Sequence, residues 1–164
     1  MGDAGRHRHP GARPGGGGAA KKGGQDAQAL GRSRGGFGTK LHVCVDALGL
    51  PVRLILGPGQ QNDMAPACDL IDSLAAESVI ADKAYDGQRL YDKVIEQGGD
   101  PVVPPRRHRR RKHAYDQALY KERNRVENFF NRIKHCRRIA TRYDKLAETF
   151  MGFVVLASIM LWLK

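Results

Sequence analysis

The sequence predicts an α/β domain over residues 35–164, and three observations support this fold class. Residues 39–56 alternate apolar and polar positions around a turn, as a β-hairpin does. Helix-like and short strand-like segments then alternate between residues 62 and 103. Two long helical segments follow residue 113. A chain of 164 residues is long enough for one domain with a hydrophobic core.

The N-terminal part has a different composition, because 13 of the 20 glycines lie in the first forty residues. A glycine-rich stretch of this kind buries too little apolar surface to offset the loss of chain entropy on folding. We therefore expect residues 1–34 to be a disordered Gly/Arg-rich segment.

The first ordered element is predicted to be a hairpin. Residues 39–45 are rich in alternating β-branched positions, residues 46–49 make a turn in which Asp46 is a turn residue, and residues 52–56 return as a second strand. His42 lies within the first of these strands and is predicted to be structural.

Helices and short strands are predicted next. A helix capped by Asn62 or Asp63 runs to residue 74 with Pro66 in its first turn, and residues 78–81 form a buried strand. Asp86 is predicted to cap a helix that runs to residue 97 and ends at two glycines. Residues 101–103 form the last strand.

Two helices, 114–139 and 143–163, are predicted to complete the domain. The uncharged run 150–163 contains fourteen residues, fewer than the roughly 20 that a membrane-spanning helix needs. We therefore expect a terminal core helix and no membrane association.

Charge is distributed unevenly over a net charge of +11. Residues 1–40 carry +6, residues 41–104 carry −6 and residues 105–145 carry +11. An acidic middle between basic flanks is typical of a metal-binding centre beside surfaces for a polyanion. A general basic chromatin-like protein ranks last, because it leaves the acidic middle unexplained.

The three cysteines are scattered, with no CxxC pair or Cys/His cluster of the kind that binds zinc. Cys44 and Cys136 are predicted to be small buried thiols. The N-terminus has charge but lacks the apolar segment of a secretory signal, so a cytoplasmic location is expected.

Four residues stand out in the segment 114–139. Tyr120, Arg123, Glu127 and Lys134 are spaced by three, four and seven residues, which places them within roughly a 60° arc of a helix. Such a stripe presents one carboxylate among cations and a phenol. The alternative is an ordinary amphipathic helix with i,i+4 ion pairs such as Arg123 with Glu127.

This spacing, Tyr-x2-Arg-x3-Glu-x6-Lys, resembles the signature around the last acidic residue of DDE transposases from bacterial insertion sequences. The sequence at residues 31–42, 80–86 and 138–145 is also similar to that family. The resemblance covers residues 31–164 in the expected order. It implies a ribonuclease-H-like fold, in which helices flank a mixed sheet.

One departure from the family pattern concerns the first strand and its catalytic aspartate. No apolar run precedes residue 39, so the first strand is expected to be missing or scrambled and the domain N-terminally incomplete. Asp3 is the sole aspartate of the first ten residues and lacks hydrophobic neighbours to seat it in a sheet.

The resemblance implies in-line attack on DNA phosphorus assisted by two Mg²⁺ (or Mn²⁺) ions. Asp82, at the end of the strand 78–81, and Glu127 would then be the catalytic, metal-binding carboxylates. The alternatives without a catalytic role are a turn residue for Asp82 and a surface glutamate for Glu127. Tyr120, Arg123 and Lys134 would contact DNA or position the site.

A run of cations precedes the helix that carries Glu127. It is either a solvated loop or a clamp for the DNA backbone, with affinity that falls steeply as salt rises. Its predicted DNA-binding residues are Arg106, Arg107, Arg109, Arg110, Arg111 and Lys112.

The function implied is transposition, by cleavage and strand transfer at the ends of an insertion sequence and into target DNA. A homodimer associated with the bacterial nucleoid is expected. The alternatives are a catalytically dead, DNA-binding remnant that inhibits or regulates an intact transposase, and another ribonuclease-H-like nuclease. Only an active transposase would combine metal-dependent nicking with strand transfer.

Overall fold

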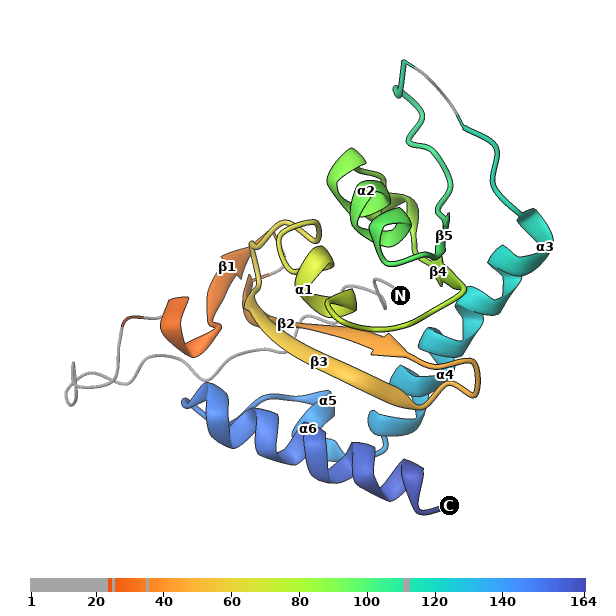
Figure 1. The fold of residues 1–164 in the computed structure, drawn as a ribbon. Coiled ribbons are helices and arrows are strands. Elements are labelled where there is room, and N and C mark those ends of the chain that lie inside the picture. The colour runs from red at the N-terminus through yellow and green to blue at the C-terminus, as the bar shows by residue number, and fades with distance from the viewer. Residues whose placement is uncertain (1–23, 25, 35, 111–112) are drawn as a thin grey trace. The chain divides into compact units, whose positions relative to one another are not determined.

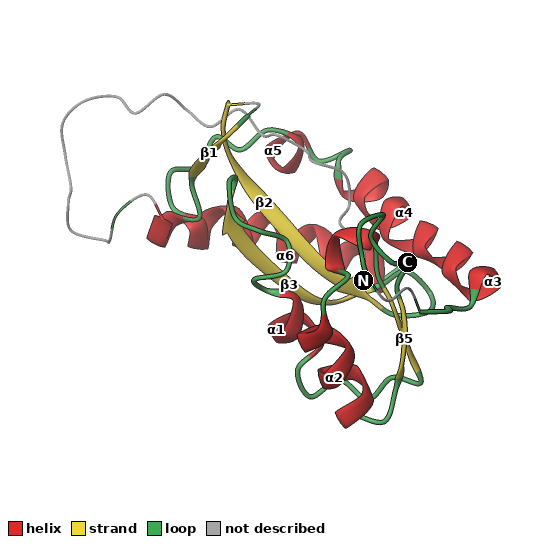
Figure 2. Cartoon of the chain, turned by 90° about the horizontal axis from the view of Figure 1, so that it is seen from above, coloured by secondary structure: helices red, strands yellow, loops and turns green. Residues whose placement is uncertain are grey.

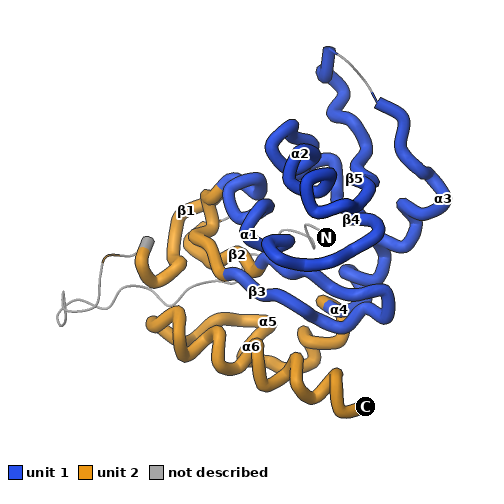
Figure 3. The backbone as a smooth tube through the Cα atoms, in the orientation of Figure 1, with its two compact units in different colours: residues 1–5, 42–55, 62–129 blue, residues 6–41, 56–61, 130–164 orange. Residues whose placement is uncertain are grey.

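A computed structural model describes residues 24, 26–34, 36–110 and 113–164 (Figure 1). The chain forms two compact units (Figure 3). Among the described residues, the first unit contains 42–55 and 62–129, and the second contains 24–41, 56–61 and 130–164.

The predicted hairpin is confirmed, and its strands are longer than the sequence indicates. Strand β2 spans Gly36–Val45 and β3 spans Pro51–Pro58, side by side in Figure 2. Asp46 makes the turn, because its Oδ1 accepts hydrogen bonds from the backbone amides of Leu48 and Leu50, both at 2.9 Å. Gly49 follows with φ of +79°, a conformation that glycine adopts without strain.

Order begins earlier than predicted. A 3-10 turn, η1 (Asp26–Gln28), and a short strand, β1 (Gly31–Ser33), form where a disordered segment was expected. β1 pairs antiparallel with β2 and completes a three-stranded sheet in the order β1-β2-β3. Arg142, more than 110 residues further along the chain, donates hydrogen bonds to the carbonyls of Gln28 and Ala29. The remainder of the predicted disordered segment, with Asp3, lies outside the described residues.

The second sheet contains two short parallel strands, β4 (Ser78–Ile80) and β5 (Asp100–Val102). The chain crosses between them through the 3-10 turn η2 (Lys83–Tyr85) and helix α2 (Gln88–Glu96). The sequence predicts one mixed sheet that lacks its first strand, whereas the described strands form two separate sheets. No described strand bridges them.

Two predicted helix starts are wrong. Helix α1 is only Ala67–Ile71, with Pro66 at its N-cap, because Asn62 instead closes a local turn with its Oδ1 3.0 Å from the Met64 amide. Helix α2 starts after Gly87 rather than after Asp86. Asp86 does not cap it, because its carboxylate binds other partners.

The predicted helix 114–139 is interrupted. Helix α3 (Gln117–Tyr120), the 3-10 turn η3 (Lys121–Arg123) and α4 (Asn124–Ile133) follow one another directly. Cys136 then takes an extended backbone, with ψ of 104°, and the short helix α5 (Arg137–Ala140) begins after it. The last helix, α6, covers Ala147–Trp162 and so starts later than predicted.

The core of the first unit is formed by α1, α2 and the strands beside them. It consists of buried side chains, listed here: Ala67, Leu70, Ile71, Ala81, Tyr85, Leu90, Tyr91, Val94 and Val103. His42 is buried as predicted, with its Nδ1 3.4 Å from the Tyr85 hydroxyl. Cys44 is half-buried, and burial raises the pKa of its thiol.

The second unit packs α5 against α6, where Ile139, Phe150 and Val154 are buried. α6 also leaves apolar side chains exposed, with Leu156 at 60% and Met160 at 59%. Cys136 is exposed, which contradicts the predicted buried thiol, because it stands in the link between α4 and α5. Within the described residues, no helix is long and apolar enough to cross a bilayer.

Candidate active site

Asp82 directly follows the strand β4. The Ala81 amide continues the pairing with β5 through a 3.2 Å hydrogen bond to the Val102 carbonyl, and the chain then turns into η2. Asp82 has extended backbone angles there, and its side chain makes no capping hydrogen bond. This position after a strand end agrees with the strand predicted before Asp82, and the metal-binding role of its carboxylate stays a prediction.

Tyr120 ends the helix α3, whose start is fixed by Asp116. Asp116 Oδ1 accepts hydrogen bonds from the amides of Ala118 at 2.8 Å and Leu119 at 2.9 Å. The rings of Tyr115 and Tyr120 meet edge to face, with centroids 5.6 Å apart. Asp116 and Tyr115 were missed by the sequence analysis, although an aspartate before a helical apolar pattern is a common N-cap signal.

The pKa of the Tyr120 hydroxyl shows which charges surround it. Burial raises this pKa, and the negative charges of Asp82 and Glu127 raise it further, against the opposite effect of Arg123. Asp82, from a strand end, and Arg123 and Glu127, from the segment η3–α4, therefore all act electrostatically on the hydroxyl of Tyr120 at the end of α3. A tyrosine phenol is neutral at physiological pH at its ordinary pKa, and the raised pKa extends to higher pH the range in which Tyr120 can donate a hydrogen bond.

Arg123 and Glu127 form an ion pair one helical turn apart, with Arg123 Nη2 2.6 Å from Glu127 Oε1. The Glu127 side chain is 45% exposed, so one face of the carboxylate is open to solvent. This i,i+4 pair is the contact that an ordinary amphipathic helix would make. The electrostatic effect of Asp82 on Tyr120 is what an ordinary helix does not explain.

Side chains that could bind a metal ion do not form a cluster of three among the described residues, since no three His, Cys, Asp or Glu side chains there gather closely enough. The candidate donors are the two carboxylates that the sequence predicts, Asp82 and Glu127, both of which act electrostatically on Tyr120. Hard divalent cations bind carboxylate oxygens and complete their coordination with water and phosphate oxygens, so two carboxylates fit one such cation.

Lys134 follows the end of α4 and belongs to the second unit. Its amide donates a 3.1 Å hydrogen bond to the Phe130 carbonyl, and burial lowers the pKa of its ammonium group. Lys134 is therefore partly desolvated, and its predicted contact with DNA stays a prediction.

The arginines of the basic segment, residues 106–113, differ in the contacts that they make. Arg106 and Arg109 bind groups of the first unit, whereas the side chains of Arg107 and Arg110 make no hydrogen bond or ion pair with the described residues. Arg111 and Lys112 lie outside the described residues, so their predicted DNA contacts stay predictions.

The first unit also contains a cavity of about 550 Å³ that the sequence does not indicate. Its lining comes from the end of β2, the link to β4 and the helical segment 119–126, and Arg123 reaches it from the candidate site. Asp82, Tyr120 and Glu127 do not line it.

Comparison with known proteins identifies relatives. The family described as the transposase DDE domain matches residues 3–162. A putative transposase for insertion sequence element IS6501 from Brucella ovis is 42% identical over 130 residues, which cover 77% of this chain and 98% of that protein. A putative transposase for IS402 from Burkholderia cepacia is 28% identical over 131 residues, covering 73% of this chain and 60% of that relative.

No solved structure gives a significant match to this chain, so the ribonuclease-H-like assignment stays a prediction. The family match covers nearly the whole sequence, and it contains both Asp82 and Glu127. The chain belongs to the DDE transposases of insertion sequences.

Proposed function

We propose that this chain cleaves DNA at the ends of an insertion sequence and joins them to target DNA by metal-assisted phosphoryl transfer. One observation carries the proposal: the carboxylates of Asp82 and Glu127, 45 residues apart in the sequence, both act on the hydroxyl of Tyr120. Membership of the DDE transposase family supports it.

Each residue of the site has a distinct role in this proposal. Asp82 and Glu127 would hold Mg²⁺ or Mn²⁺, which when bound activates the attacking oxygen and stabilises the leaving oxygen. Arg123 orients the Glu127 carboxylate through their ion pair. Tyr120, whose raised pKa leaves its phenol protonated, donates a hydrogen bond to a phosphate oxygen.

A second candidate function rests on the number of carboxylates. Within the described part of the chain, no three His, Cys, Asp or Glu side chains form a group that could hold a metal ion, so Asp82 and Glu127 are not part of a three-acid cluster. If a cation needs a third carboxylate, the chain binds DNA without cutting it and regulates an intact transposase. Both functions involve DNA, and we propose that either is carried out by a homodimer at the nucleoid.

The test is metal-dependent nicking of a duplex that contains the element's ends. Glu127→Gln and Asp82→Asn should each abolish nicking while DNA affinity stays within about twofold, because each change removes a metal ligand and keeps the side-chain shape. Glu122→Gln is the matched control on the same helical segment. Glu122 pairs with Arg125 at 2.8 Å and is 51% exposed, so its loss should leave nicking unchanged.

Two outcomes decide between the candidates. Nicking by the Glu127→Gln protein at the rate of the unmodified chain would show that this carboxylate is not catalytic. An unmodified chain that binds DNA yet produces no nicks with either Mg²⁺ or Mn²⁺ would favour the regulatory remnant.

A further inference from the structure

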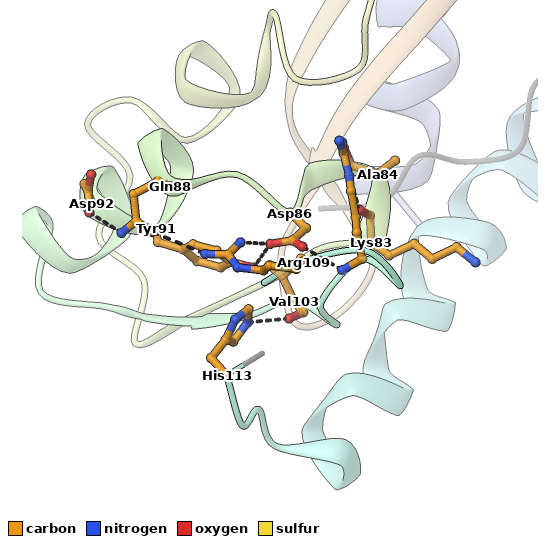
Figure 4. A network of polar contacts seen from close by, with 10 residues as sticks. Lys83, Ala84, Asp86, Gln88, Tyr91, Asp92, Val103, Arg109 and His113 are labelled. Atoms are coloured by element: carbon orange, nitrogen blue, oxygen red, sulfur yellow. Dashed lines mark hydrogen bonds and ion pairs between the residues drawn. The ribbon is translucent and has the colours of Figure 1, made fainter. Parts of the chain in front are cut away.

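Asp86 is a buried carboxylate that the candidate active site does not use. Its side chain is 1% exposed and accepts hydrogen bonds from the Tyr91 hydroxyl at 2.8 Å and the Arg106 amide at 2.6 Å. The guanidinium of Arg109 forms an ion pair with the same carboxylate (Figure 4). Three donors therefore converge on Asp86, and two of them come from the start of the basic segment.

The guanidinium groups of Arg106 and Arg109 are engaged inside the first unit. Arg106 donates to the carbonyls of Lys83 at 3.1 Å and Ala84 at 2.5 Å. Arg109 also donates to Gln88 Oε1 at 3.2 Å and lies 4.9 Å from the centroid of the Tyr91 ring. Both arginines are held by the turn η2 and the helix α2.

The far end of the segment is held as well. His113 Nε2 lies 3.0 Å from the Val103 carbonyl, and the His113 ring meets the Tyr91 ring at 4.8 Å between centroids. Tyr91 therefore contacts Asp86, Arg109 and His113 (Figure 4).

Arg107 and Arg110 differ from their neighbours. Arg106 is exposed as they are, but the side chains of Arg107 and Arg110 make no hydrogen bond or ion pair with any residue that the structure describes. They alternate with the two anchored arginines.

We propose that Asp86 is a positioning residue that anchors the basic segment through Arg106 and Arg109, so that Arg107 and Arg110 are the cations that contact DNA phosphates. This inference rests on the DNA binding proposed above. It also removes Arg106 and Arg109 from the set of direct phosphate contacts.

The physical reason is the cost of breaking the anchor. If Arg109 moved to a phosphate, it would leave a buried carboxylate without its charged partner, which is strongly unfavourable. An anchored segment also loses less conformational entropy when it binds, so its exposed cations bind phosphates more tightly than those of a free loop.

Matched arginine substitutions test which arginines contact DNA phosphates. Arg110→Gln and Arg107→Gln should each reduce the slope of log K against log salt by about 0.9, since each removes one phosphate contact. Arg109→Gln and Arg106→Gln remove the same charge but should leave that slope unchanged. Affinity for a duplex of unrelated sequence between 50 and 200 mM salt supplies the slope. Equal slope losses for Arg109→Gln and Arg110→Gln would overturn the proposal.

Asp86→Asn tests the anchor itself, because a net-charge effect and the loss of the anchor predict opposite changes in DNA affinity. Removing a negative charge beside a DNA-binding loop should tighten binding if only net charge matters. Loss of the anchor should instead weaken binding by about threefold to tenfold with the salt slope unchanged. Asp86→Glu, which retains the carboxylate, should recover part of the affinity. Tighter binding by the Asp86→Asn protein would refute the anchor.

A measurement without DNA separates this inference from the proposed function. Limited trypsin digestion should cut the unmodified chain faster after Arg107 and Arg110 than after Arg106 and Arg109, and Asp86→Asn should remove that difference. Circular dichroism confirms that each protein is folded, and Tyr91→Phe replaces Asp86→Asn if the latter is not. A chain that binds no DNA but shows this cleavage pattern would disprove DNA binding and retain the anchor. Equal cleavage at all four arginines would disprove the anchor.

Discussion

Asp86 in the first unit and Arg142 in the second are both buried charges, yet their partners differ in kind. Asp86 is neutralised by a full positive charge, that of Arg109. Arg142 is 1% exposed and donates mainly to neutral acceptors, the carbonyls of Gln28, Asp144 and Lys145 at 3.0, 2.8 and 3.1 Å. One charge is balanced by an ion pair, and the other is solvated by backbone dipoles.

The difference shows what each charge holds in place. Arg142 also donates to Ala29 O and to Thr39 Oγ1, and its guanidinium lies 5.2 Å from the Phe150 ring centroid. It thus joins the N-terminal turn η1, strand β2 and helix α6 of its unit. Asp86 instead holds one surface segment. Loss of Arg142 should therefore affect the whole second unit, whereas loss of Asp86 should have a smaller and more local effect.

The largest effect is expected for Arg142→Met. Methionine fills similar space but donates no hydrogen bonds, so several buried carbonyls lose their donor, at a cost of about 3 kcal/mol or more in the free energy of unfolding. Urea denaturation followed by circular dichroism measures this loss. Arg138→Met is the control, because Arg138 is exposed, its guanidinium lies 4.5 Å from the Phe153 ring centroid, and its side chain makes no hydrogen bond or ion pair with the described residues. An Arg142→Met protein within 1 kcal/mol of the unmodified chain would contradict the structural role.

Asp86→Asn should destabilise the chain by about 2 kcal/mol at neutral pH, since a buried ion pair loses its negative partner. Burial alone would raise the pKa of Asp86, but the hydrogen bonds from Arg106 and Tyr91 and the charge of Arg109 lower it below 3.8. The carboxylate therefore stabilises the fold above pH 3.8, and this contribution disappears as pH falls through the lower pKa of the folded state.

Denaturation midpoints measured from pH 7 down to pH 2 check the sign of this pH dependence. The gap between the unmodified chain and the Asp86→Asn protein should narrow as the pH falls. A gap that widened in acid would mean that the carboxylate is not held in its charged form.

Tyr91→Phe should have a smaller effect, about 1 kcal/mol, because one hydrogen bond is lost and the ring remains. Burial and the neighbouring Asp86 charge raise the pKa of the Tyr91 hydroxyl above its usual value. Its stabilising contribution is therefore complete below pH 10 and is lost only at higher pH. Ultraviolet titration of tyrosine absorbance should show one fewer late-titrating phenol in the variant.

The smallest effect is expected where the ion pair is exposed. Arg125 and Glu122 pair at 2.8 Å, with side chains 47% and 51% exposed, so Arg125→Gln should change stability by no more than about 0.5 kcal/mol. Thermal unfolding in low and high salt gives this value. A larger loss would indicate that Arg125 has a role beyond the surface pair.

Much of the element order could be predicted from local patterns. The hairpin, the strand before Asp82 and the crossover helix follow from alternation, glycines and turn residues, and the structure confirms them. The helix boundaries were less predictable. Asn62 and Asp86 both have the composition of an N-cap, but their side chains bind elsewhere.

The candidate site was predicted in part. Helical spacing alone placed Tyr120, Arg123 and Glu127 on one face, and the structure adds the electrostatic effect of Asp82 on Tyr120. The catalytic roles of these residues stay predictions. The sequence did not indicate which arginines of the basic segment are anchored, because a loop has no periodicity that distinguishes Arg106 and Arg109 from Arg107 and Arg110.

The sequence by itself determined the family, the order of the elements and the positions of the two carboxylates, because these depend on local spacing. Only the tertiary structure decided which charges face inward. Asp86 and Arg142 lie in polar stretches that read as solvent-exposed, and each is buried because partners distant in the chain supply its hydrogen bonds. Burial of a charge depends on those distant partners, so local sequence patterns do not reveal it.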